Sequence, residues 1–115
     1  MSLKKVQEQV DEWIHTIGVR YYDPLTNAAI LSEETGEVTG LLARIYGEQS
    51  FKEASITEEV AKQRLGEELA DVLFVVACLA NQTGIDLDNA FTKKMEKRTK
   101  RDKTRHINNP KLYGK

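Results

Sequence analysis

Two long segments with helical periodicity constrain the fold of this chain more than any other feature. They run from about residue 24 to 46 and from about residue 57 to 82. Asp23 is a favourable N-cap for the first segment, and Pro24 suits its first helical position. Thr57 can cap the second. Helices of this length bury their apolar faces against other helices, which favours an all-α fold.

Two shorter helices are predicted on either side of this pair, over about 2–17 and 86–103. The apolar stripe of the first consists of Val6, Val10, Trp13 and Ile17. No stretch alternates convincingly with the period of two that is typical of strands. We therefore predict a bundle of four antiparallel helices with short loops over residues 1–105, followed by an irregular tail over 106–115.

The length of the chain predicts one domain that is completed by a second copy. A lone domain of 115 residues buries only about two-thirds of the surface of its unfolded chain. The segment between Leu69 and Ala80 is apolar on nearly every side, so it needs more cover than three short helices provide. We expect at least a homodimer. The single cysteine, Cys78, excludes an internal disulfide, and we expect it to be buried.

Charge and hydropathy indicate a cytoplasmic protein without a membrane or nucleic-acid partner. The first residues lack the apolar segment of a signal peptide, and no apolar stretch approaches the ~20 residues that span a bilayer. The net charge of −1 is unevenly distributed, because residues 93–105 hold eight Lys and Arg against two acids, a local charge of +6. This end either attracts an anion or is simply a solvated, charged helix end.

Acidic residues interrupt the apolar faces of both long helices. Glu34 and Glu37 lie within or beside the stripe of segment 24–46, and Glu68 and Asp71 do the same in segment 57–82. Each pair is spaced i, i+3, which places both carboxylates on one face. Acids are almost never fully buried without a partner, so these four need a compensating charge.

A hard cation is the partner that these four acids suggest. Two such pairs facing each other would present four carboxylates to one point, and oxygen ligands suit Mg²⁺ or Mn²⁺. The alternative is that they are ordinary solvent-facing acids paired with lysines one turn away. That alternative is weakened because their i+4 neighbours are all apolar: Val38, Leu41, Val72 and Val75.

The motifs SEETGEV at 32–38 and GEELADVLF at 66–74 resemble those of the MazG-type all-α nucleoside triphosphate pyrophosphohydrolases. The resemblance implies a Mg²⁺-dependent enzyme that cleaves an NTP or dNTP between the α and β phosphates. The products would be a nucleoside monophosphate and pyrophosphate, which fits house-cleaning of the nucleotide pool. It also implies a tight helical dimer, often paired again into a tetramer.

The resemblance also assigns roles to individual residues. The four acids match metal-ligand positions, and Glu33 matches an additional acid that either orients or deprotonates the attacking water, or binds metal. The residues that resemble phosphate-contacting positions are Arg64, Lys97 and Arg101. Trp13, Tyr21 and Tyr22 are candidates for stacking on a base, although the apolar stripe predicts a core position for Trp13.

Two other classes of protein remain open at this point. A ferritin-like di-iron protein also binds metal through carboxylates in a bundle, but it needs Glu-x-x-His motifs that are missing here. A non-catalytic helical module could bind a nucleotide or a protein partner through its basic fourth helix. The metal that is bound distinguishes the first class, and release of pyrophosphate distinguishes the second.

Overall fold

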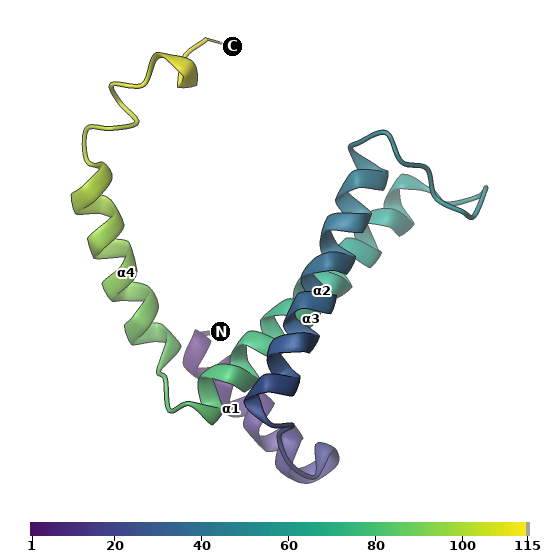
Figure 1. The fold of residues 1–115 in the computed structure, drawn as a ribbon, viewed down its shortest axis with the longest axis vertical. Coiled ribbons are helices and arrows are strands. Elements are labelled where there is room, and N and C mark those ends of the chain that lie inside the picture. Colours follow the sequence, from purple (N-terminus) through teal and green to yellow (C-terminus); the bar gives the residue numbers. More distant parts are fainter. Residues whose placement is uncertain (115) are drawn as a thin grey trace.

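The computed structural model describes residues 1–114, and Lys115, at the end of the predicted tail, lies outside the described residues. No strand occurs in this part of the chain (Figure 1), which confirms the all-α prediction. The α-helices are α1 (Leu3–Trp13), α2 (Pro24–Ile45), α3 (Glu58–Gln82) and α4 (Leu87–Asp102). A π-helical turn, η1 (Ile14–Gly18), extends α1, and a 3-10 turn, η2 (Pro110–Leu112), lies in the tail.

Helices α2 and α3 begin where their capping residues predict. The Asp23 carboxylate accepts a hydrogen bond from the Thr26 amide at 2.8 Å, and the Thr57 hydroxyl accepts one from the Val60 amide at 3.2 Å. Each bond satisfies an amide that has no partner within its own helix. The two helices then lie side by side along their length, joined by the loop at one end (Figure 1). This pairing brings the two acidic motifs together.

Helix α1 packs on α3 through a small apolar core. Val10 and Ile14 contact Ala77 and Cys78, and partly buried Val6, Tyr21 and Phe74 surround them. Cys78 is buried, as expected. Most fully buried positions of α3 are Ala or Cys, so the helices approach closely but bury little apolar area per residue.

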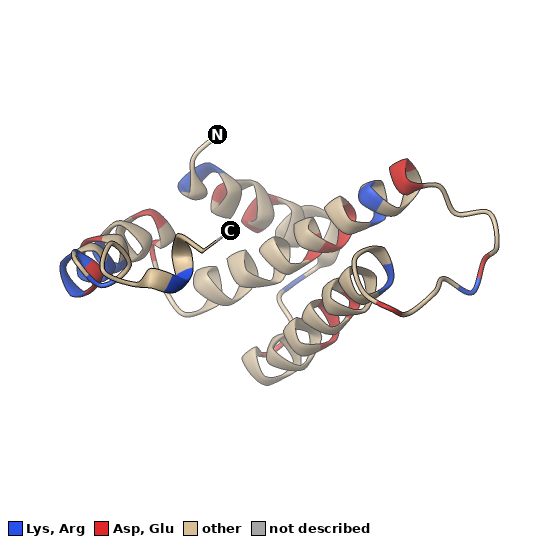
Figure 2. Ribbon diagram, turned by 90° about the horizontal axis from the view of Figure 1, so that it is seen from above, with Lys and Arg blue, Asp and Glu red and all other residues tan. Residues whose placement is uncertain are grey.

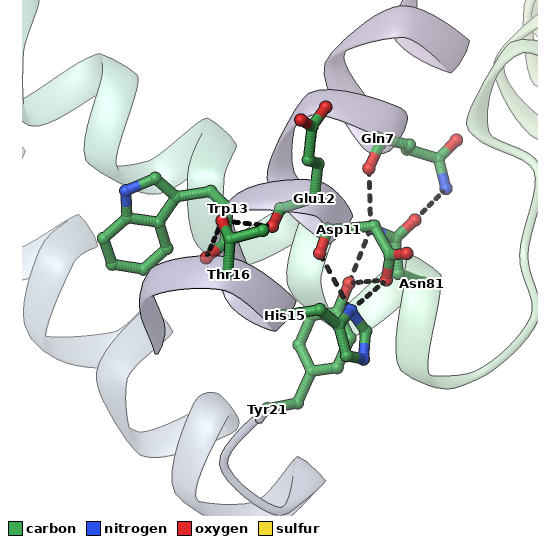
Figure 3. A network of polar contacts seen from close by, with 8 residues as sticks. All are labelled: Gln7, Asp11, Glu12, Trp13, His15, Thr16, Tyr21 and Asn81. Atoms are coloured by element: carbon green, nitrogen blue, oxygen red, sulfur yellow. Dashed lines mark hydrogen bonds and ion pairs between the residues drawn. The ribbon is translucent and has the colours of Figure 1, made fainter. Parts of the chain in front are cut away.

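A polar network fastens α1 to α3 and fixes Tyr21 (Figure 3). Asn81 accepts a hydrogen bond from the Gln7 amide at 2.9 Å and donates to the Tyr21 hydroxyl at 3.0 Å. That hydroxyl donates to Asp11 at 2.6 Å. Burial and then the bond to Asp11 raise the pKa of Tyr21 to about 12, so the phenol stays protonated and keeps donating. Tyr21 is therefore held rigidly in the segment between α1 and α2.

Helix α4 departs from the expected antiparallel packing. Its axis is bent by 104° from that of α3, and Figure 1 shows it as a separate arm. Gly84, with φ of 72°, allows the chain to turn here without the penalty that a Cβ would bring. Asp88 then accepts hydrogen bonds from the Leu3 and Lys4 amides, both at 3.2 Å, which caps α1 and anchors the base of α4.

The single chain is open rather than compact. Its radius of gyration is 18.1 Å, compared with about 13 Å for a compact domain of 100 residues. Its accessible surface is 9112 Å², whereas a folded monomer of this mass exposes about 6,400 Å². Among the described residues, no helix by itself is long and apolar enough to cross a membrane, and only the bent pair α3–α4 meets that test when taken together.

Candidate active site

Three carboxylates from the two long helices converge on one point. Glu34 and Glu37 of α2 and Glu68 of α3 each offer an oxygen, and these oxygens all lie within 4.8 Å of one another. The predicted i, i+3 spacing explains how α2 supplies two of them from one face. Oxygens this close repel one another when all three groups are ionised, so the cluster is suited to a shared cation.

Two buried oxygens of this cluster have no hydrogen-bond partner within residues 1–114. The Oε2 atoms of Glu34 and Glu68 are inaccessible to solvent, and no side chain or backbone group of the described residues donates to them. Buried polar atoms normally have a partner, and a charged one without it is especially costly. These two atoms therefore fit a hard divalent cation, for which carboxylates are preferred ligands.

The same crowding alters the pKa values of the acids. Burial, followed by the charges of Glu37 and Asp71, raises the pKa of Glu34. A hydrogen bond with Glu37, then burial and the neighbouring charges, raise the pKa of Glu68 to about 7. A carboxyl in such a place holds a proton at a pH where exposed acids have lost theirs. Binding of a cation would displace that proton.

Asp71 lies beside the cluster rather than within it. Its carboxylate oxygens are not among those of Glu34, Glu37 and Glu68 that lie within 4.8 Å of one another. It is close enough for its charge to raise the pKa of Glu34 and of Glu68. Asp71 and Glu34 together line a second cavity on the other side of the cluster.

The first cavity beside the cluster contains basic side chains. It has a volume of about 770 Å³ and is lined by Glu33, Glu37 and Glu68 together with Arg64. Arg64 is half-exposed, and its guanidinium contacts Glu53 of the α2–α3 loop at 2.9 Å. Glu33 is exposed on this cavity. The structure therefore brings together Arg64 and the acids that were predicted to share its face.

The second cavity, of about 370 Å³, is largely aromatic. Trp13, Tyr21, Tyr22 and Phe74 line it, and Glu34 and Asp71 lie at its margin. Trp13 meets Phe74 edge to face at 5.7 Å between ring centroids and is 48% exposed. The expectation that Trp13 lies in the core is therefore wrong.

A strained turn leads into this aromatic cavity. Val19 adopts φ of 75° and ψ of −59°, and the Arg20 amide donates to the Gly18 carbonyl at 2.9 Å. This geometry is that of the rare γ-turn that β-branched residues disfavour. The turn ends the helical segment one residue after Gly18 and directs Tyr21 and Tyr22 towards the cavity.

Comparisons with known proteins show the family to which this chain belongs. The profile of the MazG nucleotide pyrophosphohydrolase domain matches residues 22–106. The chain belongs to the MazG family. YpjD of Bacillus subtilis is 38% identical to it over 104 residues, covering 90% of this chain and 89% of YpjD. YvdC of the same organism is 30% identical over 102 residues, covering 88% of this chain and 96% of YvdC.

Solved MazG structures share the fold. The crystal structure of the Bacillus-conserved MazG protein, a nucleotide pyrophosphohydrolase, has a TM-score of 0.69 at 35% identity, covering 84% of this chain and 88% of that one. The crystal structure of YpjD from Bacillus subtilis has a TM-score of 0.72 at 36% identity, covering 84% and 94%. The matched MazG segment contains every predicted site residue from Glu33 to Arg101, whereas Trp13 precedes it.

Two predicted site residues of the MazG domain lie away from the carboxylates within one chain. Lys97 and Arg101 are exposed on α4, the separate arm that carries a dense group of blue segments in Figure 2. Arg101 forms a two-pronged contact with Asp102, with nitrogen–oxygen distances of 3.0 and 2.8 Å. The two guanidinium groups of Arg101 and Arg105 hold the pKa of Asp102 well below its usual range.

Three further residues of the MazG domain were not identified from the sequence. Arg44 and Lys52 line the cavity of Arg64, and Asn27 lines the aromatic cavity. Lys52 lies in the α2–α3 loop, whose position depends on tertiary packing. Asn27 precedes Ile30 on α2 by three residues, and a polar residue on an apolar face was a signal available from the spacing.

Proposed function

We propose that this protein is a Mg²⁺-dependent pyrophosphohydrolase that cleaves a nucleoside triphosphate between its α and β phosphates. The products are a nucleoside monophosphate and pyrophosphate. One observation carries the proposal: buried oxygens of Glu34 and Glu68 have no partner among residues 1–114, and Glu68 also lines the cavity that holds Arg64. Membership of the MazG family supports the same reaction.

The acidic residues would hold the metal. Glu34, Glu37 and Glu68 provide the converging oxygens, and Asp71, which lies beside them on the next turn of α3, would be a further ligand. Mn²⁺ fits the same oxygen ligands. When bound, the metal neutralises phosphate oxygens and acidifies a water molecule. Glu33, exposed on the same cavity, would orient that water or accept its proton.

Basic residues would bind the phosphates that leave. Arg64 reaches the cavity from α3 and exchanges its contact with Glu53 for a phosphate oxygen. Lys97 and Arg101 would reach the β and γ phosphates from α4 of a second copy, because α4 points away from the carboxylates of its own chain (Figure 1).

The surface of the single chain supports a homodimer, or a tetramer built from two dimers. The excess over the surface of a compact monomer is about 2,700 Å², which is in the range of permanent interfaces. Exposed apolar side chains on α3 and α4 include Leu69, Leu73, Phe91 and Met95. A second chain that covers these residues would complete the bundle.

Product analysis tests the proposal. Incubation of a panel of dNTPs with the protein and Mg²⁺ in ¹⁸O-labelled water should yield labelled monophosphate and unlabelled pyrophosphate in one step. Glu59→Gln on α3, an exposed acid outside both cavities, serves as a control and should retain activity. Release of orthophosphate with a diphosphate product would contradict the assigned site of cleavage. Nucleotide binding without any hydrolysis would instead indicate a binding module.

A further inference from the structure

Asn27 is the one polar residue among residues 1–114 that is buried, with 5% of its surface exposed. It lies in the second turn of α2, two turns before Glu34. A buried side-chain amide has two donor hydrogens and one acceptor oxygen to satisfy. Most buried polar groups have hydrogen-bond partners, so the partners of this amide, and any atom of it that has none, indicate its role.

A relay of hydrogen bonds fixes the orientation of the Asn27 amide. Gln82 Nε2 donates to the Tyr22 carbonyl at 2.6 Å, and Asn27 Nδ2 donates to Gln82 Oε1 at 2.8 Å. A carbonyl can only accept, so Gln82 has to present its NH₂ group to Tyr22 and its oxygen to Asn27. Asn27 must in turn present its NH₂ group to Gln82. The Oδ1 atom of Asn27 is thereby turned away, and no hydrogen bond within residues 1–114 reaches it.

The residue with the free acceptor lines a cavity whose walls include four aromatic side chains. Asn27 lines the aromatic cavity of about 370 Å³ together with Trp13, Tyr22 and Phe74. Pockets of this size with aromatic walls and few polar groups are typical of sites for small molecules. Glu34, a proposed metal ligand, also lines this cavity, so a ring bound here lies next to the site of phosphate chemistry.

We propose that Asn27 is a specificity-determining residue that accepts a hydrogen bond from an exocyclic amino group of the substrate base. This inference rests on the proposed function and names its substrate class: nucleotides of cytosine or adenine. Gln82 is a positioning residue, because it acts by holding the Asn27 amide in the orientation that leaves Oδ1 free.

The same geometry rejects bases that carry a carbonyl in place of the amino group. Uracil and hypoxanthine would place an oxygen where cytosine and adenine place their amino nitrogen. Two acceptors would then face each other, and the Asn27 oxygen has no hydrogen to donate to the carbonyl of the base. A site built around a buried hydrogen-bonding group discriminates in this way more strongly than one that reads size alone.

A binding experiment tests this without depending on hydrolysis. Trp13 is the single tryptophan of the chain and lines the cavity, so its fluorescence reports on occupancy. Titration with dCMP and with dUMP, each with and without Mg²⁺, should give an affinity for dCMP that is at least about tenfold higher. The pair dAMP and dIMP should show the same order. Equal affinities within each pair would overturn the proposal.

Two variants assign the discrimination to the relay. Asn27→Leu keeps the approximate volume but removes the acceptor, and should reduce the ratio of dCMP to dUMP affinity to about one. Gln82→Met keeps the length of the side chain but frees the Asn27 amide to rotate, and should reduce the ratio while both ligands still bind. Wild-type ratios in both variants would show that other groups read the base.

Steady-state kinetics separates this inference from the proposed function. For wild-type protein, kcat/KM for dCTP should exceed that for dUTP by the same factor as the affinities, and Asn27→Leu should remove the difference. If no nucleotide is hydrolysed but dCMP is still preferred, the proposed reaction fails and the base-reading role stands. If hydrolysis occurs without preference between dCTP and dUTP, the reaction stands and the role of Asn27 fails.

Discussion

Helices α2 and α3 lie together along their length, whereas α4 contacts the rest of the chain mainly at its base. The long pair carries the buried oxygens of Glu34 and Glu68, which have no hydrogen-bond partner among residues 1–114. By contrast, α4 exposes every residue from 89 to 101 and holds more Lys and Arg residues than any other helix. The chain thus separates the half of the proposed site that would bind metal from the half that would bind phosphate.

The difference teaches how one small domain can build a site for a highly charged substrate. Opposite charges within a single chain would pair with each other and leave nothing for the ligand. Here the 104° bend after α3 keeps the basic helix away from the acids of its own chain. The acidic pair and the basic arm are complementary in charge, so they favour association between copies.

The largest effect is expected from changes in the long pair. Glu37→Gln and Glu68→Gln each remove a ligand charge but keep the size of the side chain. We expect kcat/KM for pyrophosphate release to fall by about 100-fold or more in each. The circular-dichroism spectrum should stay helical, and Glu59→Gln should be unaffected. Near-normal activity in both variants would contradict the carboxylate site.

Changes in α4 should have a smaller effect and one that crosses between chains. Lys97→Ala or Arg101→Ala should lower the preference for triphosphates over diphosphates by about tenfold, because a charge-assisted phosphate contact is lost. Lys103→Ala, at the C-cap of α4 and away from the face that Lys97 and Arg101 share, is the control. Mixing Glu37→Gln chains with Arg101→Ala chains should restore part of the activity. A mixture no more active than its components would contradict a site shared between copies.

The pH dependence of stability tests the electrostatic strain in the long pair. The pKa of Glu68 is raised to about 7 and that of Glu34 is also raised, so the folded chain binds more protons than the unfolded chain below pH 7. Without metal, the free energy of unfolding should therefore fall as the pH rises from 5 to 8.

The measurement is the melting temperature in the presence of a chelator. It should be about 4–6 °C higher at pH 5 than at pH 8, equivalent to about 1 kcal/mol in a domain of this size. Glu68→Gln should reduce this slope, and saturating Mg²⁺ should reverse it, because the metal needs deprotonated ligands. A melting temperature that rises with pH in the absence of metal would contradict the raised pKa values.

The smallest effect is expected in the loop that joins α2 and α3. Glu53→Gln removes the half-exposed ion pair with Arg64 and leaves that guanidinium free for phosphate. Such pairs contribute about 0.2–1 kcal/mol, so KM for the triphosphate should fall by no more than about fivefold. Glu48→Gln, an exposed acid in the same loop, should change nothing. A higher KM in Glu53→Gln would show that Glu53 helps to bind substrate.

The helices themselves were predictable because their boundaries are set locally. Asp23, Thr57 and Asp86 each cap a helix with their own side chain, and residues of these types can be recognised as N-cap candidates from the sequence. The direction of α4 was not predictable. It depends on the turn at Gly84 and on the contact of Asp88 with a helix that lies more than 80 residues earlier.

The candidate site was predictable in part for the same reason. The i, i+3 spacing identified the three acids that converge, since they lie on faces that helical geometry defines. The spacing does not predict that Asp71 lines the aromatic cavity, because that depends on how α3 is rotated about its axis relative to α2. Trp13 was misplaced because an apolar stripe marks a packed face without showing how much of that face a neighbour covers.

The unpartnered oxygens of Glu34 and Glu68 imply a trade-off in evolution between the activity of the protein and its stability. Replacing an uncompensated buried charge with an apolar side chain of similar volume usually strengthens a protein. Leu at either position would extend the apolar stripes of α2 and α3 and remove the repulsion among the acids. A lineage that no longer needs catalysis should therefore acquire apolar residues at these two positions. Its proteins should be inactive but have a higher free energy of unfolding. Ancestral reconstruction would reveal such a drift as rising melting temperature along branches that have lost the acids.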